Sequence, residues 1–179
     1  MRHYALTAVG RDRPGIVAGI TAVLLAHEVN VEDSQMTILR GHFTMMLIVA
    51  LGADVDVDVL AADLREAGEA LDLELLTIAG VDQLADAGAA SAPSHVVTVY
   101  GTDHPGIVNA VSSALAERGV SITDLTTRLV GEEDAPLYAL QMEVAIPDDR
   151  VPDVSDALAG AAAAQGVEVS VRPLESDAL

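Results

Sequence analysis

An eight-residue pattern that offers anion-binding chemistry occurs twice in the chain. Residues 10–17 read Gly-Arg-Asp-Arg-Pro-Gly-Ile-Val, and residues 101–108, 91 positions later, read Gly-Thr-Asp-His-Pro-Gly-Ile-Val. A proline has no N–H and a φ near the helical value, so it suits the first position of a helix. A glycine lets another molecule approach the backbone closely. The free N–H groups of the first helical turn, with the helix dipole behind them, favour a carboxylate.

This pattern predicts a ligand site in each copy. Asp12 and Asp103 are expected to accept hydrogen bonds from the free N–H groups of the first turn. Arg13 and His104 occupy the variable position of the motif, where they would tune the charge preference. The candidate ligand-binding residues are Asp12, Arg13, Pro14, Gly15, Ile16 and Val17 in the first copy, and Asp103, His104, Pro105, Gly106, Ile107 and Val108 in the second.

The same turn has a simpler interpretation, because Asp-x-Pro-Gly is also a good helix start that binds nothing. Recurrence in both copies does not decide between the two, since a duplication copies structural residues too. A bulky residue in place of Gly15 or Gly106 is expected to abolish binding while leaving the fold intact. Unfolding of both variants would show instead that these glycines are structural.

No catalytic or metal-binding constellation is evident in the sequence. Cysteine is absent, which excludes disulfides, thiolate metal sites and cysteine nucleophiles. The five histidines have no paired spacing for a metal, and His104, beside a candidate site, has no evident nucleophile or triad partner. We therefore expect no catalytic residue, no metal and no cofactor, and a protein that is not an enzyme.

Composition excludes further classes of function. The chain has 28 acidic and nine basic residues and a net charge of −19, so it would repel phosphate backbones. Its few aromatic residues offer little stacking surface for single-stranded nucleic acid. The longest apolar run, residues 45–51, is far shorter than the ~20 residues of a membrane helix. The N-terminus lacks the apolar run of a signal peptide, and we expect a cytoplasmic protein without nucleic-acid or membrane partners.

The elements that position the two turns follow the same order in both copies. Apolar periodicity predicts strands at 3–9, 30–40, 43–51 and 71–78, a helix that Pro14 opens, and a helix at 55–68. In the second copy it predicts strands at 95–100, 120–130, 137–146 and 167–173, and helices at 105–118 and 151–164. This is the α+β, ferredoxin-like β-α-β-β-α-β unit, a four-stranded antiparallel sheet with two helices on one face.

The predicted domains are 1–80 and 94–174, with a linker at 81–93 and a tail at 175–179. The linker region, rich in Ala, Gly, Ser and Asp, could hold a short helical piece at 81–86. The second copy gains about four residues around 131–136. The strand at 43–51 is apolar on both faces, which predicts that the partner repeat or another chain covers its second face. A homo-oligomer is expected on this ground.

A β-α-β-β-α-β unit with Asp-x-Pro-Gly-Ile-Val at its first strand-to-helix turn resembles the ACT domain. The tandem pair resembles the glycine cleavage system transcriptional repressor type of ACT protein, over nearly the whole chain. The resemblance implies that a small amino acid, with glycine and serine as first candidates, binds where the turn of one unit meets the second strand of its neighbour. It places Asn30 and Ser121 as polar groups for this ligand. Ser121 is shorter than Asn30, so the two sites are expected to differ in affinity.

Three functions remain open. The leading hypothesis is a regulatory protein whose amino-acid ligand changes its contacts with a partner protein. By the resemblance, that partner would be a DNA-binding transcriptional regulator, with no direct contact to DNA. The second is a regulatory subunit acting in trans on an enzyme of amino-acid metabolism, since ACT units occur fused to such enzymes. The third is a ligand-free oligomerisation module.

Overall fold

The computed structural model describes residues 1–81, 92–130 and 137–174, in two compact units. The units divide between Leu84 and Ala85. Most of the expected linker, its helical piece beyond residue 81, the four-residue gain and the C-terminal tail lie outside the described residues. Within the described residues, no helix is long and apolar enough to cross a membrane.

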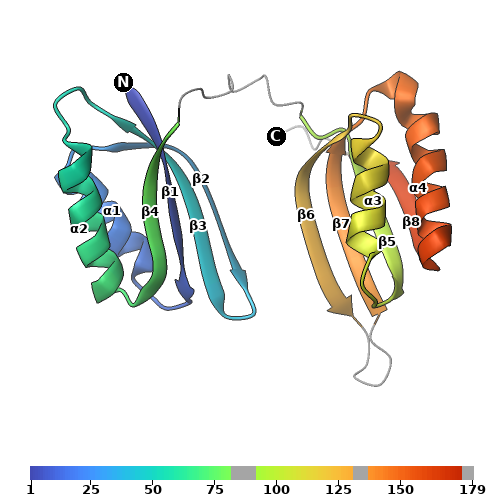
Figure 1. The fold of residues 1–179 in the computed structure, drawn as a ribbon, viewed down its shortest axis with the longest axis horizontal. Helices are drawn as coiled ribbons and strands as arrows, with labels where there is room; N and C mark the ends of the chain where they lie inside the picture. Colours follow the sequence, from blue (N-terminus) through green and yellow to red (C-terminus); the bar gives the residue numbers. More distant parts are fainter. Residues whose placement is uncertain (82–91, 131–136, 175–179) are drawn as a thin grey trace. The chain divides into compact units, whose positions relative to one another are not determined.

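Unit 1 has the predicted order of elements. These are β1 (Arg2–Arg11), α1 (Ile16–Ala26), β2 (Asn30–Leu39), β3 (His42–Leu51), α2 (Val57–Ala70) and β4 (Leu73–Val81). The strands form one antiparallel sheet in the order β2-β3-β1-β4, and both helices cover the same face (Figure 1). Arg40 and Gly41, both with positive φ, form the tight β2–β3 turn. The strand predicted at 43–51 begins one residue earlier, at His42.

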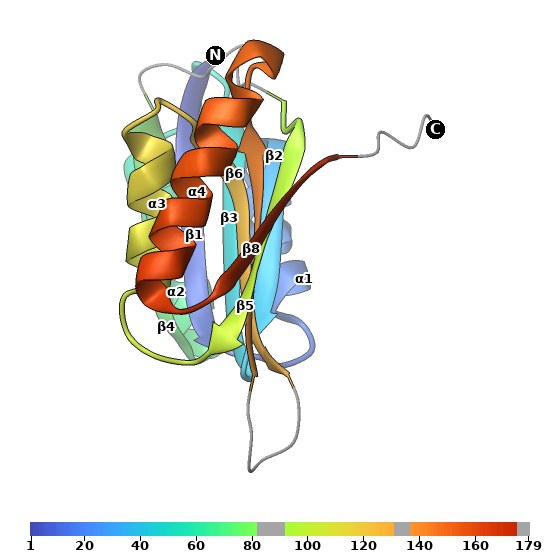
Figure 2. The same cartoon turned by 90° about the vertical axis from the view of Figure 1, so that its right-hand side faces the viewer.

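Unit 2 repeats the arrangement. Its elements are β5 (His95–Thr102), α3 (Ile107–Ala116), β6 (Ser121–Val130), β7 (Leu137–Ala145), the short 3₁₀ helix η1 (Asp148–Arg150), α4 (Val151–Gln165) and β8 (Glu168–Pro173). The antiparallel sheet has the order β6-β7-β5-β8, and α3 and α4 lie side by side on one face (Figure 2). The predicted ferredoxin-like fold is confirmed in both units. The single turn η1 was not predicted.

The helices contact their sheets through one ridge of aliphatic residues spaced four apart. In α1 these are Ile16, Ile20 and Leu24, in α2 Leu60 and Leu64, in α3 Ile107, Val111 and Leu115, and in α4 Val154, Leu158 and Ala162. Residues four apart lie on the same face of a helix, and each ridge packs on buried strand residues such as Leu6 and Val97. The cores are therefore almost entirely aliphatic, with Phe43 as the buried aromatic residue of unit 1, and they form thin layers of helix on sheet.

The second face of β3 is apolar and open. Phe43, Met45 and Leu47 are buried under the helices, whereas Met46 on the other face is 49% exposed. Leu75 of β4, on the same open face by register, is 44% exposed. In unit 2 the positions equivalent to Met46 and Ile48 hold Gln141 and Glu143. The open face of β3 is thus more apolar than the equivalent face of β7. Coverage of the β3 face stays a prediction.

The first glycine of each repeated segment allows two strands to approach. A Cβ at Gly101 would lie 2.4 Å from Val167 Cγ1 and 3.2 Å from Val167 Cα. A Cβ at Gly10 would lie 2.9 Å from Leu73 Cδ2 and 3.2 Å from Leu73 Cα. Because a backbone atom is involved at both positions, a rotamer change alone cannot make room. The start of the last strand in each unit therefore depends on this glycine.

We predict opposite effects of two glycine-to-alanine changes in unit 2. Gly101→Ala should lower the free energy of unfolding by about 1–3 kcal/mol, because the added methyl overpacks the contact with Val167. Gly160→Ala, in the exposed interior of α4 with no atom within 4 Å, should raise it by about 1 kcal/mol. Urea unfolding followed by circular dichroism measures both. Equal destabilisation by the two changes would show that the close approach at Gly101 is not responsible.

Candidate functional site at the turns before α1 and α3

A glycine in the left-handed region ends the turn in each unit. Gly15 has φ +97° and ψ −10°, and Gly106 has φ +110° and ψ −20°. Side chains of L-residues disfavour this conformation. The sequence predicted that these glycines admit a ligand and left a structural role open, and the backbone conformation favours glycine at both positions. The space beside Gly15 is nevertheless open, because a Cβ there would meet no atom within 4 Å.

Two expectations about the helix starts are wrong. Pro14 and Pro105 do not open the helices, because the glycine that follows each proline is the N-cap and the helices begin at Ile16 and Ile107. Asp12 and Asp103 do not cap them either, since neither helix receives a side-chain cap hydrogen bond. The left-handed glycine redirects the chain between the aspartate and the helix. Asp12 contributes a backbone contact in place of a cap. Its N–H donates a hydrogen bond to the carbonyl oxygen of Gly41 at 2.9 Å, which connects the turn to the β2–β3 hairpin.

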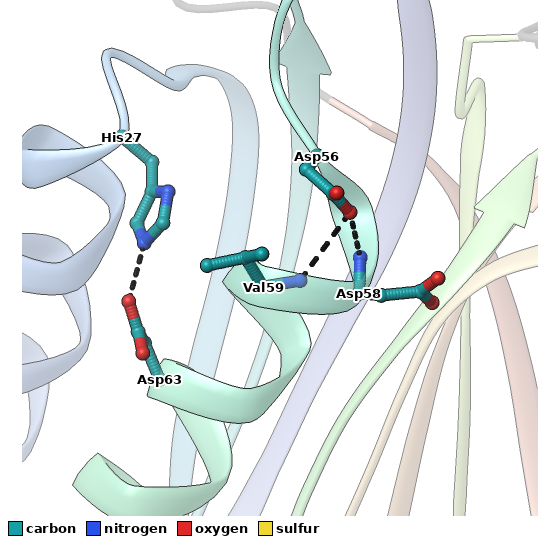
Figure 3. Close-up of polar contacts among 5 residues, drawn as sticks. All are labelled: His27, Asp56, Asp58, Val59 and Asp63. Atoms are coloured by element: carbon teal, nitrogen blue, oxygen red, sulfur yellow. Dashed lines mark hydrogen bonds and ion pairs between the residues drawn. The ribbon is translucent and has the colours of Figure 1, made fainter.

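The start of α2 shows what a capped helix looks like in the same unit. The Asp56 carboxylate accepts hydrogen bonds from the N–H groups of Asp58 at 2.9 Å and Val59 at 3.4 Å (Figure 3). Helix α4 also lacks a side-chain cap, but it continues directly from η1. Only α1 and α3 combine an uncapped first turn with a left-handed glycine among the described helices. Their first amides are therefore available to a ligand.

The variable cation of each turn contacts the end of the second helix. Arg13 Nη2 donates to the carbonyl oxygen of Ala70 at 3.2 Å, and His104 Nε2 lies 2.9 Å from that of Gln165. Ala70 and Gln165 are the last residues of α2 and α4, where the helix dipole favours a cation. The sequence showed a basic or titratable residue at both positions. The partner could not be identified, because it depends on where the second helix ends.

In unit 2 the structure gathers all six predicted turn residues around one open pocket of about 720 Å³. Three polar residues that the sequence analysis missed also line it, namely Asn109, Ser112 and Tyr138. Asn109 and Ser112 lie three apart on α3, so helical spacing from the motif could have identified them. Tyr138 faces Gly101 in the β5–β7 register. At the matching positions of the repeat, unit 1 holds Ala18, Thr21 and Phe43, which predicts a less polar site.

Asn30 and Ser121 are not brought to the turn of their own unit. Asn30 begins β2 and pairs with Ala50, next to the start of β1, whereas the turn follows the end of β1. Ser121 likewise begins β6 and pairs with Ala145. A ligand at the turn could reach either side chain only from a second unit. Their role remains a prediction.

A second pocket, of about 340 Å³, lies at the other end of the helices of unit 1. His27, at the end of α1, lines this pocket, and its Nε2 lies 2.7 Å from Asp63 Oδ2 (Figure 3). Glu28, Asp54 and Asp56 also line it. This acidic lining disfavours a carboxylate ligand. Among the described residues no group of three His, Asp or Glu side chains is placed to hold a metal ion.

The comparison against protein families agrees with this duplication of fold and turn. The ACT domain model matches residues 3–78 and again residues 95–172. The chain belongs to the ACT domain family. ACT domains are regulatory modules that bind amino acids. The ACT pair accounts for nearly all of the described residues.

Two curated relatives match different lengths of this chain. The chain is 46% identical over 77 residues to a UPF0237 protein of Methanopyrus kandleri, a match that covers 42% of this chain and 86% of that protein. It is 28% identical over 169 residues to the phosphoserine phosphatase SerB2 of Mycobacterium tuberculosis. That second match covers 93% of this chain but only 39% of the phosphatase.

Two solved structures resemble both units together. A protein of Galdieria sulphuraria aligns with a TM-score of 0.77 at 26% identity, covering 97% of this chain and 98% of the other. A candidate glycine cleavage system transcriptional repressor aligns with a TM-score of 0.74 at 18% identity, covering 97% of both chains. At that identity the second likeness shows a shared fold.

We predict that the Asp56 cap stabilises unit 1. Asp56→Ala should lower the free energy of unfolding by about 1 kcal/mol, because two amides at the start of α2 lose their acceptor. The nearby exposed Asp54→Ala should change it by less than about 0.5 kcal/mol. Both are measured by urea unfolding. Equal losses would attribute the effect to charge and not to capping.

Gly15→Ala should lower the free energy of unfolding by about 1–2 kcal/mol, because alanine is strained at a φ of +97° even where space is open. Gly52→Ala is the matched control, since a Cβ there makes only an ordinary contact of 3.9 Å and its φ lies outside the left-handed region. Thermal unfolding of both variants measures the difference. A Gly15→Ala protein as stable as the wild type would contradict a structural need for this glycine.

Proposed function

We propose that this chain is a non-enzymatic regulatory protein that binds a small amino acid at the turns before α1 and α3. Glycine and serine are the first candidates. The ligand would sit between ACT units and change how the protein contacts a partner protein, such as a DNA-binding transcriptional regulator. The observation that carries this proposal is the pair of uncapped helix starts behind left-handed glycines.

The pocket of unit 2 supports an amino acid as the ligand. The first amides of α3, at Ile107 and Val108, offer N–H donors and the positive end of the helix dipole to a carboxylate. The exposed carboxylate of Asp103, on the same rim, offers an acceptor to an ammonium group. Ser112 offers a further polar contact. One short zwitterion satisfies both ends of this arrangement.

The net charge of −19 supports a protein partner in preference to nucleic acid. A ligand shifts the equilibrium between the free and the partner-bound protein only by the difference in its affinity for the two forms. A ligand held between ACT units would have different affinities for the free and the partner-bound protein, because a partner that moves one unit changes the ligand site.

The match to SerB2 favours one alternative, a regulatory subunit that acts in trans on an enzyme of amino-acid metabolism. Nearly the whole of this chain aligns with less than half of that phosphatase. Co-purification with a metabolic enzyme would favour this alternative over a transcriptional partner. A ligand-free oligomerisation module is the third candidate, and the apolar open face of unit 1 is the observation that favours it.

The proposal predicts selective stabilisation in a thermal-shift screen against the twenty amino acids. A ligand at about a hundred times its dissociation constant stabilises the folded protein by about 2.7 kcal/mol, which raises the Tm by several degrees for a chain of this size. Ser112→Ala should weaken binding in unit 2, because this side chain lines the pocket. Ser113→Ala, on the same helix but outside the lining, serves as the control.

A shift with one or two small amino acids that Ser112→Ala reduces and Ser113→Ala leaves in place would support the proposal. The absence of a shift with all twenty would contradict it, and would leave the oligomerisation module as the better explanation.

A further inference from the structure

The same contact is made by different side chains in the two units. In unit 1 Arg13 donates to the carbonyl oxygen at the end of α2, and in unit 2 His104 occupies the equivalent position at the end of α4. The contact between turn and second helix is thus present in both copies, while the chemistry of the donor differs. An arginine is always charged at physiological pH, whereas a histidine gains or loses its charge near neutrality.

His104 has two partners, and both are acceptors. Its Nδ1 lies 3.0 Å from the carbonyl oxygen of Pro105, and its Nε2 lies 2.9 Å from that of Gln165. A neutral imidazole carries one N–H, and the imidazolium carries two. Both contacts are therefore hydrogen bonds only in the protonated ring. After loss of a proton, the lone pair of one ring nitrogen would face a carbonyl lone pair, and that contact would be repulsive.

We propose that His104 is a positioning residue whose protonated ring clamps the ligand-binding turn of unit 2 to the end of α4. Unit 2 then loses affinity for an amino-acid ligand as the pH rises, while unit 1, held by Arg13, does not. This inference rests on the proposed function, because it concerns the same turn. The other acceptor of the ring, the carbonyl of Pro105, belongs to the peptide that leads into Gly106, and a Cβ at Gly106 would be 3.1 Å from Gln165 Oε1. Release of the ring would therefore act on the backbone that presents the first amides of α3.

The groups around His104 set the direction of its titration. The carbonyl of Pro105 and then that of Gln165 raise the pKa of His104 above its ordinary value of 6.5, burial opposes them, and the Asp103 carboxylate adds to the rise. Tyr138 of β7 lines the same pocket, while Asn109 and Ser112 of α3 are uncharged. Because the folded pKa is raised, the clamp is complete at pH values well below 6.5. It is lost as the pH rises through the raised value.

The first experiment needs no ligand. In ¹H–¹⁵N NMR spectra of the full chain, the ring nitrogens of His104 should show mainly the imidazolium form at pH 6.5. The amide signals of Gly106 and Ile107 should titrate with the same midpoint, above 6.5. The amides of Gly15 and Ile16 should not share that midpoint, because Arg13 keeps its charge. The proposal would be overturned if the amide signals of Gly106 and Ile107 did not shift as His104 titrates.

Exchanging the two cations provides matched variants. His104→Arg should remove the titration from the turn of unit 2, and Arg13→His should introduce it into the turn of unit 1. The other four histidines, His3, His27, His42 and His95, stay in place in both variants and control for background titration. If His104→Arg does not fold, Arg13→His still decides the matter. An Arg13→His turn that stays insensitive to pH would count against the clamp.

Binding is then measured calorimetrically at about pH 6 and about pH 8.5, with glycine or the amino acid that gives the largest thermal shift as the probe. Affinity at unit 2 should fall by up to about tenfold for each unit by which the ligand raises the pKa of His104, and His104→Arg should lack this fall. Equal affinity of the wild type at both pH values would overturn the clamp. Failure of all twenty amino acids to bind would instead contradict the proposed function, and the NMR titration would still decide the clamp.

Discussion

The left-handed glycine between the first strand and the first helix is the constraint on which both candidate sites depend. It turns the chain so that the helix begins without a side-chain cap, and it leaves the aspartate of the motif outside the helix. With a conventional cap, as Asp56 provides for α2, the first amides would already be bonded. The conformation of one residue therefore converts an ordinary helix start into a group of available donors.

The second helix supports this turn from the far side. Each unit places the end of its second helix beside the turn, and the carbonyl at that end receives the cation of the motif. The contact relates the position of the turn to the packing of α2 or α4. A ligand or partner that shifts a second helix would thus also change the position of the turn, because a direct hydrogen bond joins the two.

The sequence predicted the fold well because its signals were local and duplicated. Apolar residues at helical and strand spacing predicted the eight strands and four α-helices of the described residues, and the repeat allowed each copy to support the other. The helix starts were mispredicted because proline and aspartate indicate a conventional cap, whereas the positive φ of Gly15 and Gly106 is a property of the folded backbone. The contact of His104 with Gln165 joins residues far apart in the chain, and no local pattern encodes it. Tyr138 was missed for the same reason, since its position depends on the register of β7 against β5.

The two open sheet faces have diverged since the duplication, with Met46 exposed in unit 1 where Gln141 stands in unit 2. An interface that joins copies head to tail needs two different complementary patches and can grow into a filament, whereas a single self-complementary patch pairs two copies and then stops. Between sheet faces, the apolar face of unit 1 matches the same face of a second copy better than the polar face of unit 2, which is the second route. If copies of the chain associate through their sheets, the polar replacements in unit 2 would restrict that association to one pair of unit 1 faces.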